Sequence, residues 1–493
     1  MRGLSKCPPS SVVCVAATAA TIGLLAMPAV AQNSSTAERR IQRAIREAER
    51  GTPLYEVDTS LQIYERSLFE VGGYSTFTYV NLDDPDGNNR TLWQPGVTIF
   101  GRAVIDGAHT FFVRADFQYQ AFSEGDSWDG RGDGWEEPFL DRYWYEFDLN
   151  RAQASSGSPV SGVNFNIRAG RQFVDWGAGL ALSEILIAAR PRIVFQPAEL
   201  GEFSLEGLAG VTPSDDSITD FDASRNGFNT DTSRGYFGGL VRYTTRSDNE
   251  FWGYLLYMPD YNSGDKSRFA IEPNDVNFEY EAFYVGLGAE GGFTPQLRYL
   301  GEFVYEFGNS QSDPLRGPQQ EQDISAFAAR GQLAWYFRDV NRTSLYFETF
   351  FGSGDGDRQV TTDTVGGNLA GTTDRAFNSL GFAYTGLAFA PAISNVVVAR
   401  VGASTSPFPN SGIFSGIQVG IDLNISGKIL ADAPIEEPTN DDHYLGFEPD
   451  FTLNWQLTSD LSFVARYGIF FPGAAIENKD VRQFIYLGMS LSF

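Results

Sequence analysis

Arginines on the polar rows of alternating stretches are the side chains of this 493-residue chain best suited to bind a ligand. A guanidinium binds a carboxylate or a phosphate through two parallel hydrogen bonds. Seven arginines lie in stretches where polar and apolar residues alternate: Arg114, Arg142, Arg168, Arg242, Arg298, Arg330 and Arg466. Carboxylates share their polar rows, among them Asp116, Glu302 and Glu448. Two interpretations follow: the charges line an aqueous passage and select its solutes, or they neutralise one another as internal ion pairs.

Other chemistry has little support in the sequence. The only histidines, His109 and His443, lie far apart in sequence, which leaves few residues for a Ser-His-Asp triad or a histidine metal site. We therefore expect no enzyme and no cofactor, although a hydrolase that uses only carboxylates stays open. Within the acidic, glycine-rich stretch 123–137, Asp126, Asp129 and Asp133 are weak candidates for Ca²⁺ binding. Their spacing is not that of an EF-hand, and a solvated surface loop is the alternative.

The elements that position these arginines are β-strands, because the alternation has a period of two. In residues 109–122, for example, Val113 and Phe117 fall on one face, and Arg114, Asp116 and Gln118 fall on the other. Such runs recur from about residue 69 to the end, and most approach the roughly 9–11 residues that a tilted strand needs to cross a bilayer. One lipid-facing row and one wet row are typical of an outer-membrane barrel. The sequence predicts an all-β fold, a transmembrane antiparallel β-barrel.

The last stretch, Gln483 to Phe493, has the same pattern and ends on an aromatic residue. An exposed terminal strand invites aggregation in a soluble domain, whereas in a closed barrel the last strand pairs with the first. We therefore expect this strand to close the barrel, with the edge of a soluble sandwich as the alternative. A C-terminal strand of this kind also resembles the signal that the barrel-insertion machinery reads.

The number of strands is predicted as about 18, within a range of 16–20. Loop compositions rich in Asp, Gly, Asn and Ser separate the strands, in the ranges 81–96, 123–138, 213–234, 259–277, 308–325, 353–376 and 428–443. With this count, the short links at 245–250 and 338–342 fall at the end of the barrel opposite the periplasmic turns, where long loops are expected. This indicates a missed or surplus strand. The ambiguous stretches are 178–202 and 386–412.

The N-terminal part differs from the predicted barrel, which spans 69–493. Residues 1–31 have a positive start, an apolar core and an Ala29-Val30-Ala31 cleavage site, as a secretory signal peptide does. A membrane anchor helix is the alternative. Both cysteines lie in this segment, so we expect neither disulfides nor thiol chemistry in the mature chain. Residues 32–68 form a periplasmic extension with an amphipathic helix at 36–50, either a small plug or a weakly ordered leader.

The net charge of −26 excludes one class of partner. Loss of Arg2 and Lys6 with the signal peptide would make it −28. Nucleic-acid binding needs a basic face, so we expect no such partner. Expected partners are outer-membrane lipid and lipopolysaccharide, the barrel-insertion machinery, and periplasmic export proteins.

Three motifs resemble those of the alginate export family of Gram-negative outer-membrane barrels. They are a Gly170-Arg171-Gln172 strand end followed by a strand at 203–211, the stretch 444–450, and the stretch 466–473 before the final strand. The resemblance implies an 18-stranded monomeric barrel that passes a polyuronate or related acidic polysaccharide. Arg168 and Arg466 sit on the corresponding strands. The acid-rich inner row and the extension 32–68 depart from the family pattern.

These observations together predict a passive outer-membrane channel of alginate-export type. It would conduct an anionic polysaccharide or other anionic solutes past arginines and acids. A loop at 173–202 would fold inward as a constriction. A general or sugar-type diffusion porin is the runner-up, and a non-conducting barrel that serves as a receptor or scaffold is the third interpretation.

Overall fold

The computed structural model describes residues 62–123, 132–135, 139–196, 201–213, 234–260, 279–313, 316–358 and 368–493. The predicted signal peptide, the helix at 36–50, Asp126 and Asp129 lie outside these residues. Within them, no helix has the length and apolar character to cross a membrane.

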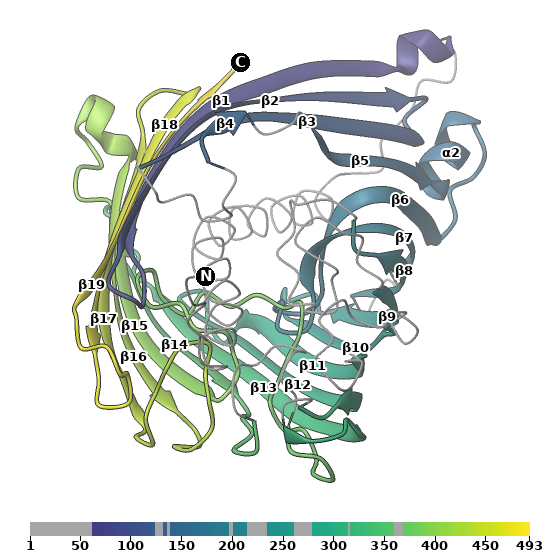
Figure 1. Ribbon diagram of the computed structural model, residues 1–493. Helices are drawn as coiled ribbons and strands as arrows, with labels where there is room; N and C mark the ends of the chain where they lie inside the picture. Colours follow the sequence, from purple (N-terminus) through teal and green to yellow (C-terminus); the bar gives the residue numbers. More distant parts are fainter. Residues whose placement is uncertain are drawn as a thin grey trace, which may run out of the picture.

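Eighteen antiparallel strands close into a ring, and a further short strand lies outside it (Figure 1). The strands of the ring are β1 (Leu68–Asp83), β2 (Asn89–Ile105), β3 (His109–Phe122), β5 (Phe139–Asp148), β6 (Val163–Asp175), β7 (Ser183–Phe195), β8 (Glu202–Val211), β9 (Gly235–Thr244), β10 (Glu250–Met258), β11 (Glu281–Gly292), β12 (Leu297–Gln311), β13 (Glu321–Tyr336), β14 (Ser344–Gly352), β15 (Val396–Thr405), β16 (Ile417–Lys428), β17 (Tyr444–Gln456), β18 (Leu461–Pro472) and β19 (Arg482–Ser492). The short strand β4 (Gly134–Trp135) pairs only with β3.

The C-terminal strand closes the ring, as the sequence predicts. β19 pairs with β1 from Tyr74↔Ser492 to Leu82↔Phe484, and the purple and yellow ends of the chain meet in Figure 1. Phe493 continues this contact, because its backbone N–H donates to the Gly73 carbonyl oxygen at 2.9 Å. Closure satisfies the backbone groups that an open sheet edge would leave unpaired in lipid.

The two ends of the barrel differ in the length of their connections. One end, which we call the turn end, holds the start of β1, the end of β19 and mostly short links such as 106–108, 293–296 and 457–460. Its longer links contain the helix α2 (Leu149–Ser155), which Asp148 caps by accepting from Arg151 N at 2.9 Å, and the 3₁₀ helix η3 (Gly412–Gly416). A 3₁₀ helix η1 (Ile63–Arg66) precedes β1. The opposite end, the loop end, holds the longest links, which in outer-membrane barrels face the exterior.

The structure corrects several predicted boundaries. The range 81–96 is mostly strand, because β1 runs to Asp83 and β2 begins at Asn89 around a five-residue turn. The ambiguous stretch 178–202 contains β7, and 386–412 contains β15. With β7 in place, the links 245–249 and 337–343 both fall at the turn end, which removes the parity conflict. The predicted inward loop at 173–202 was too wide, because only 176–182 leaves the wall.

Candidate functional site

Two segments leave the wall and enter the lumen, and we call 176–182 the short segment and 368–395 the long segment. They are bonded to each other: Phe382 N donates to the Gly179 carbonyl oxygen at 2.7 Å, and Ser183 N donates to that of Leu380 at 2.9 Å. The Ser379 hydroxyl donates to the Leu180 carbonyl oxygen at 2.7 Å. The segments therefore form one unit inside the barrel.

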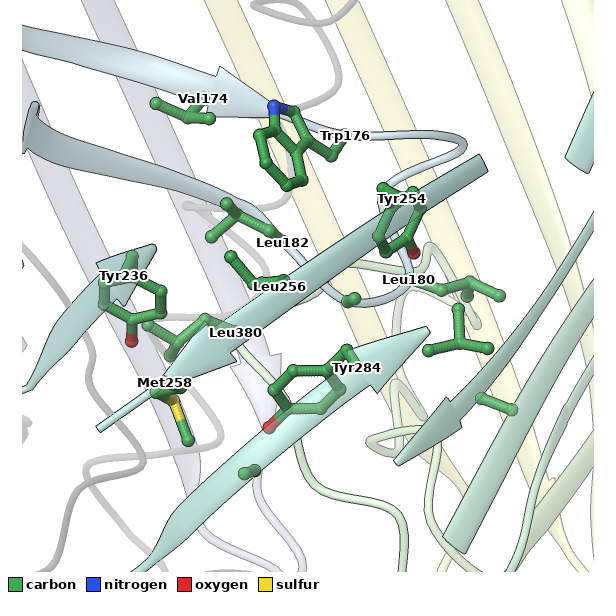
Figure 2. Packing of buried hydrophobic residues seen from close by; sticks show 14 of the residues in the cluster. Val174, Trp176, Leu180, Leu182, Tyr236, Tyr254, Leu256, Met258, Tyr284 and Leu380 are labelled. Atoms are coloured by element: carbon green, nitrogen blue, oxygen red, sulfur yellow. The ribbon is translucent and has the colours of Figure 1, made fainter. Parts of the chain in front are cut away.

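An apolar cluster seats this unit against β8 to β13 (Figure 2). Trp176 is fully buried, and its ring centroid lies 5.9 Å from that of Tyr254. Leu180 of the short segment and Leu380 of the long segment join Leu256 of β10 in the same cluster. Apolar side chains on the inner face of a barrel need a protein cover, and these segments supply it.

The carboxylate of Glu302 holds the short segment. Its Oε2 accepts the backbone N–H of Ala178 at 3.0 Å and of Leu180 at 3.3 Å, and Tyr254 donates its hydroxyl to Oε1 at 3.1 Å. The backbone approaches so closely that a Cβ at Gly177 would lie 1.8 Å from Glu302 Oε1, and Gly177 has φ +62°. Only glycine fits this position without displacing the anchor.

Glu448 holds the long segment in the same way. Its carboxylate accepts three successive backbone N–H groups, from Leu387 at 2.6 Å, Ala388 at 2.7 Å and Phe389 at 2.8 Å. The Phe389 ring stacks on Phe470 of β18 with centroids 4.3 Å apart. Three consecutive donors around one carboxylate form the kind of concave anion cradle that protein backbones offer to phosphates.

Arginines of β13 and β15 complete the attachment. Arg330 pairs with Glu348 at 2.8 Å and donates to the Ala178 carbonyl oxygen at 3.1 Å. Arg400 pairs with the other oxygen of Glu348 at 3.0 Å and donates to the Tyr384 carbonyl oxygen at 2.6 Å. Burial raises the pKa of the Tyr384 hydroxyl well above its usual range, and the nearby Asp450 carboxylate adds to that effect. These arginines thus tie the backbone of both segments to the barrel wall.

The wall of β3, β5 and β6 is different, because the inward charged side chains Arg114, Asp116, Glu146 and Arg168 stay partly exposed. Arg114 donates from Nε to both carboxylate oxygens of Asp141, at 3.0 and 2.9 Å. Arg168 pairs with Glu146 at 2.5 Å, and its guanidinium lies 4.2 Å from the Trp144 ring centroid. Asp116 accepts from Thr98 and from Gln118, each at 2.8 Å. We call β3, β5 and β6 the open wall.

Three other predicted arginines are buried. Arg142 donates to the Asp141 carbonyl oxygen at 2.8 Å, and Arg242 lies 3.3 Å from Glu250. Arg171 is opposite Tyr143 and Ile187 in the sheet register, so it belongs to the row of β6 that alternates with Arg168.

Arg466 and Arg298 are the predicted arginines for which the described part of the chain provides neither a hydrogen bond nor an ion pair. Arg466 lies on β18 between Thr452 and Tyr486, partly exposed, with its Nε buried and unpaired. Arg298 lies near the turn end of β12 and is exposed. Both arginines lie on the inward rows of their strands.

No group of three or more acidic, histidine or cysteine side chains suited to a metal ion occurs among the described residues. Of the three weak Ca²⁺ candidates, only Asp133 is described, and its Oδ1 accepts from Phe122 N at 2.7 Å. That contact ties the loop to the end of β3.

Sequence reasoning missed the charged residues Arg190, Arg400 and Glu206. Arg190 pairs with Glu206 at 2.7 Å, and Trp176 donates to the same Glu206 oxygen at 2.9 Å. Both Arg190 and Arg400 lie on strands hidden in the ambiguous stretches. The strand that contains Arg190 was missed because Pro191 follows this arginine, and a proline inside an apolar run argues against a central strand.

Comparisons with known proteins agree with the geometry. A family model described as alginate export matches residues 223–490. The fold is similar to Pseudomonas aeruginosa OpdO, with TM-score 0.51 and 12% identity over 88% of this chain and 99% of that one. It is also similar to Acinetobacter baumannii OccAB2, with TM-score 0.51 and 10% identity over 86% and 98%. For Pseudomonas aeruginosa OccK8 (OprE) the values are 0.50 and 11% over 86% and 98%. A search of curated proteins found no match.

Proposed function

The chain belongs to the alginate export family of outer-membrane barrels, and from this premise we propose that it is a passive channel for an anionic polysaccharide of the alginate type. The coarser statement, an outer-membrane channel, follows from the family and the fold. What needs support is the preference for an anionic solute.

The observation that carries this proposal is the unpaired guanidinium of Arg466. Arg168 and Arg114 on the open wall already have carboxylate partners, so each contributes little net field to the lumen. Arg466 has no ion pair or hydrogen bond among the described residues, only a longer-range charge interaction with Asp422, and it remains partly exposed. A guanidinium in this state can bind a uronate carboxylate through two hydrogen bonds and release it again, because no buried pair must be broken.

The experiment is single-channel recording on purified protein in planar bilayers. We expect an anion-selective current that polyuronate blocks, and Arg466→Ala is expected to lower both the anion preference and the block. Arg168→Ala is also expected to lower the anion preference, because it leaves the negative charge of Glu146 unpaired, but it should weaken the block less, because Arg168 is already held by Glu146. Arg466→Lys is the matched control: it keeps the charge but loses the fork geometry, so selectivity should survive while the block weakens.

Two outcomes would contradict the proposal. An unchanged reversal potential in Arg466→Ala would show that this side chain does not face the conducting path. Absence of current in the wild-type protein would exclude a channel altogether and favour a receptor or scaffold.

A general diffusion porin is the second candidate, and the ion-paired arginines favour it. Arg114, Arg168 and Arg330 are each matched by a carboxylate, so most of the lumen is close to neutral. Weak selectivity with no block by polyuronate would support this candidate over the first. Block by a neutral oligosaccharide of equal length would point to a sugar-type porin.

A further inference from the structure

The two mouths of the barrel, at the loop end and at the turn end, carry very different net charges. Among the described residues, the connections between strands at the loop end contain 16 acidic and 5 basic residues, whereas those at the turn end contain 4 of each. In the described part of the chain, the excess negative charge of the connections is therefore concentrated at one end. The described residues show how part of this charge is arranged.

Three loop-end segments, 84–88, 429–443 and 473–481, form one continuous rim above β16 to β2. Asn478 donates from its side chain to the Pro85 carbonyl oxygen at 2.8 Å, and Asn440 N donates to that of Ala475 at 2.9 Å. We call these segments the acidic rim. Its exposed carboxylates are Asp86, Asp432, Asp441, Asp442, Glu477 and Asp480.

Positive charge on this rim is small. Within the three segments, Lys479 is the exposed basic residue, and its ammonium donates to the carbonyl oxygens of Gly473 at 2.6 Å and Ala474 at 3.0 Å. Below the rim, Glu437 is buried and pairs with Arg482 at 2.6 Å. Burial raises the pKa of the Glu437 carboxyl while the Arg482 guanidinium opposes that rise, so this pair adds no free positive charge to the mouth.

The turn end is balanced by comparison. Its described connections expose four arginines, Arg151, Arg246, Arg338 and Arg342, against Asp248, Asp339 and Asp460, and Glu65 is exposed in η1. Arg298 lies at the turn end of β12, and Arg466 lies about midway along β18. Along the axis, fixed charge therefore passes from negative at the loop end to nearly balanced at the turn end.

We propose that this axial charge asymmetry makes the channel rectify, so that anions pass more readily from the turn end to the loop end under an applied potential than in the reverse direction. The inference rests on the proposed channel function. Fixed negative charge at a mouth concentrates cations there and depletes anions. When the loop-end chamber is positive, cations enter through the acidic rim and anions enter past Arg298. Both ions then accumulate in the lumen and the current rises. The opposite polarity draws anions from the acidic mouth, which excludes them, so the lumen is depleted of ions and the current falls.

The test is a current–voltage curve of single wild-type channels of known orientation. A Ser459→Cys variant carries a turn-end thiol, and its biotin label, reached by streptavidin from one chamber only, identifies that chamber. We expect the current with the loop-end chamber positive to exceed the opposite current about twofold near 0.1 M KCl. The ratio should approach one near 1 M KCl, because the Debye length falls from about 10 Å to about 3 Å.

Two variants assign the effect to the rim. The first carries Asp86→Asn, Asp432→Asn, Asp441→Asn, Asp442→Asn, Glu477→Gln and Asp480→Asn, and its current ratio at low salt should fall to near one. The matched control is Glu321→Gln with Asp323→Asn, which removes exposed charge at the loop end of β13 from the outward row, away from the mouth. This control should keep the wild-type ratio.

The outcomes separate this inference from the proposed function. Symmetric current at low salt overturns the inference and leaves the channel intact. Rectification that persists at high salt, or that survives the rim variant, assigns the asymmetry to pore shape and also overturns it. A wild-type protein that carries no current contradicts the proposed function itself.

Discussion

The wall of β3, β5 and β6 and the wall of β10 to β12 present the same apolar row to lipid but opposite rows to the lumen. On the first, Arg114, Glu146 and Arg168 stay partly exposed and pair with one another or with a neighbour. On the second, Trp252, Tyr254 and Leu256 are buried beneath the two inward segments. The inward row of a barrel strand thus shows whether water or protein lies against it.

The same residue type has different roles on the two walls. Glu146 of the open wall offsets an arginine, whereas Glu302 and Glu448 of the other walls accept backbone N–H groups and anchor the inward segments. An inward carboxylate therefore belongs to the charges that line the pore only where its partner is another side chain or water. A carboxylate that binds the backbone of an inward segment does not. We therefore expect the anchoring carboxylates to set the size of the lumen and the exposed charges to set its selectivity.

Removal of an anchor is the change with the largest expected effect. Glu448→Ala leaves three backbone N–H donors of the long segment without an acceptor, and each unsatisfied buried donor costs about 1–3 kcal/mol. The segment is expected to leave its site, so single-channel current should rise and the open state should become noisy. Glu448→Gln keeps one acceptor oxygen for Leu387 N and Ala388 N but places its NH2 against Phe389 N, so an intermediate effect is expected. Equal currents in all three proteins would show that the long segment does not limit the conducting path.

Loss of the buried Trp176 indole is expected to have the next largest effect, a decrease in the free energy of unfolding. Trp176→Ala removes the largest fully buried side chain, and Phe or Trp to Ala changes in cores cost about 3–5 kcal/mol. The free energy of unfolding in detergent micelles, from a guanidinium titration, measures this. Phe112→Ala on the open wall is the matched comparison, because Phe112 is partly exposed and should cost clearly less. Similar losses at both positions would remove the distinction between covered and open walls.

Much of the fold could be predicted from the sequence, because polar and apolar residues alternate along a strand that has lipid on one face and an aqueous lumen on the other. Strand type, closure by Gln483–Phe493 and the approximate number of strands all follow from it. The structure confirms these predictions.

The covering of the lumen could not be predicted in the same way. β10 reads Phe-Trp-Gly-Tyr-Leu-Leu-Tyr-Met after Glu250, apolar on both rows, and a strand buried on both faces has this composition. That signal tells which wall is covered but not which segment covers it. The partners are distant in sequence: Ala178 meets Glu302, and Leu387 meets Glu448. Spacing alone cannot distinguish such anchoring carboxylates from pore-lining ones.

A charge change on each wall sharpens the comparison further. Glu146→Gln releases the Arg168 guanidinium from its ion pair, so the open wall gains net positive charge. We expect the anion preference to rise, measured as a shift in reversal potential in a KCl gradient. Glu302→Gln makes the same chemical change on the covered wall, and we expect no shift there because the side chain is buried against the short segment. Equal shifts in both variants would mean that both carboxylates face the conducting path.

The smallest expected effect lies outside both walls, in the turn after β13. Asp339 accepts from Thr343 N at 2.8 Å and from the Thr343 hydroxyl at 2.6 Å, and these bonds lower the pKa of its carboxyl. A lowered folded-state pKa contributes stability above the unfolded value, about 3.9 for Asp, and that contribution is lost as the pH falls through the folded value. Asp339→Asn should therefore unfold slightly more easily than wild type at pH 7, and the difference should shrink as the pH falls through the lowered pKa of the folded state. Because the side chain is exposed, conductance and selectivity should not change at either pH. A current change in Asp339→Asn would show that the turn end, like the acidic rim, influences the conducting path.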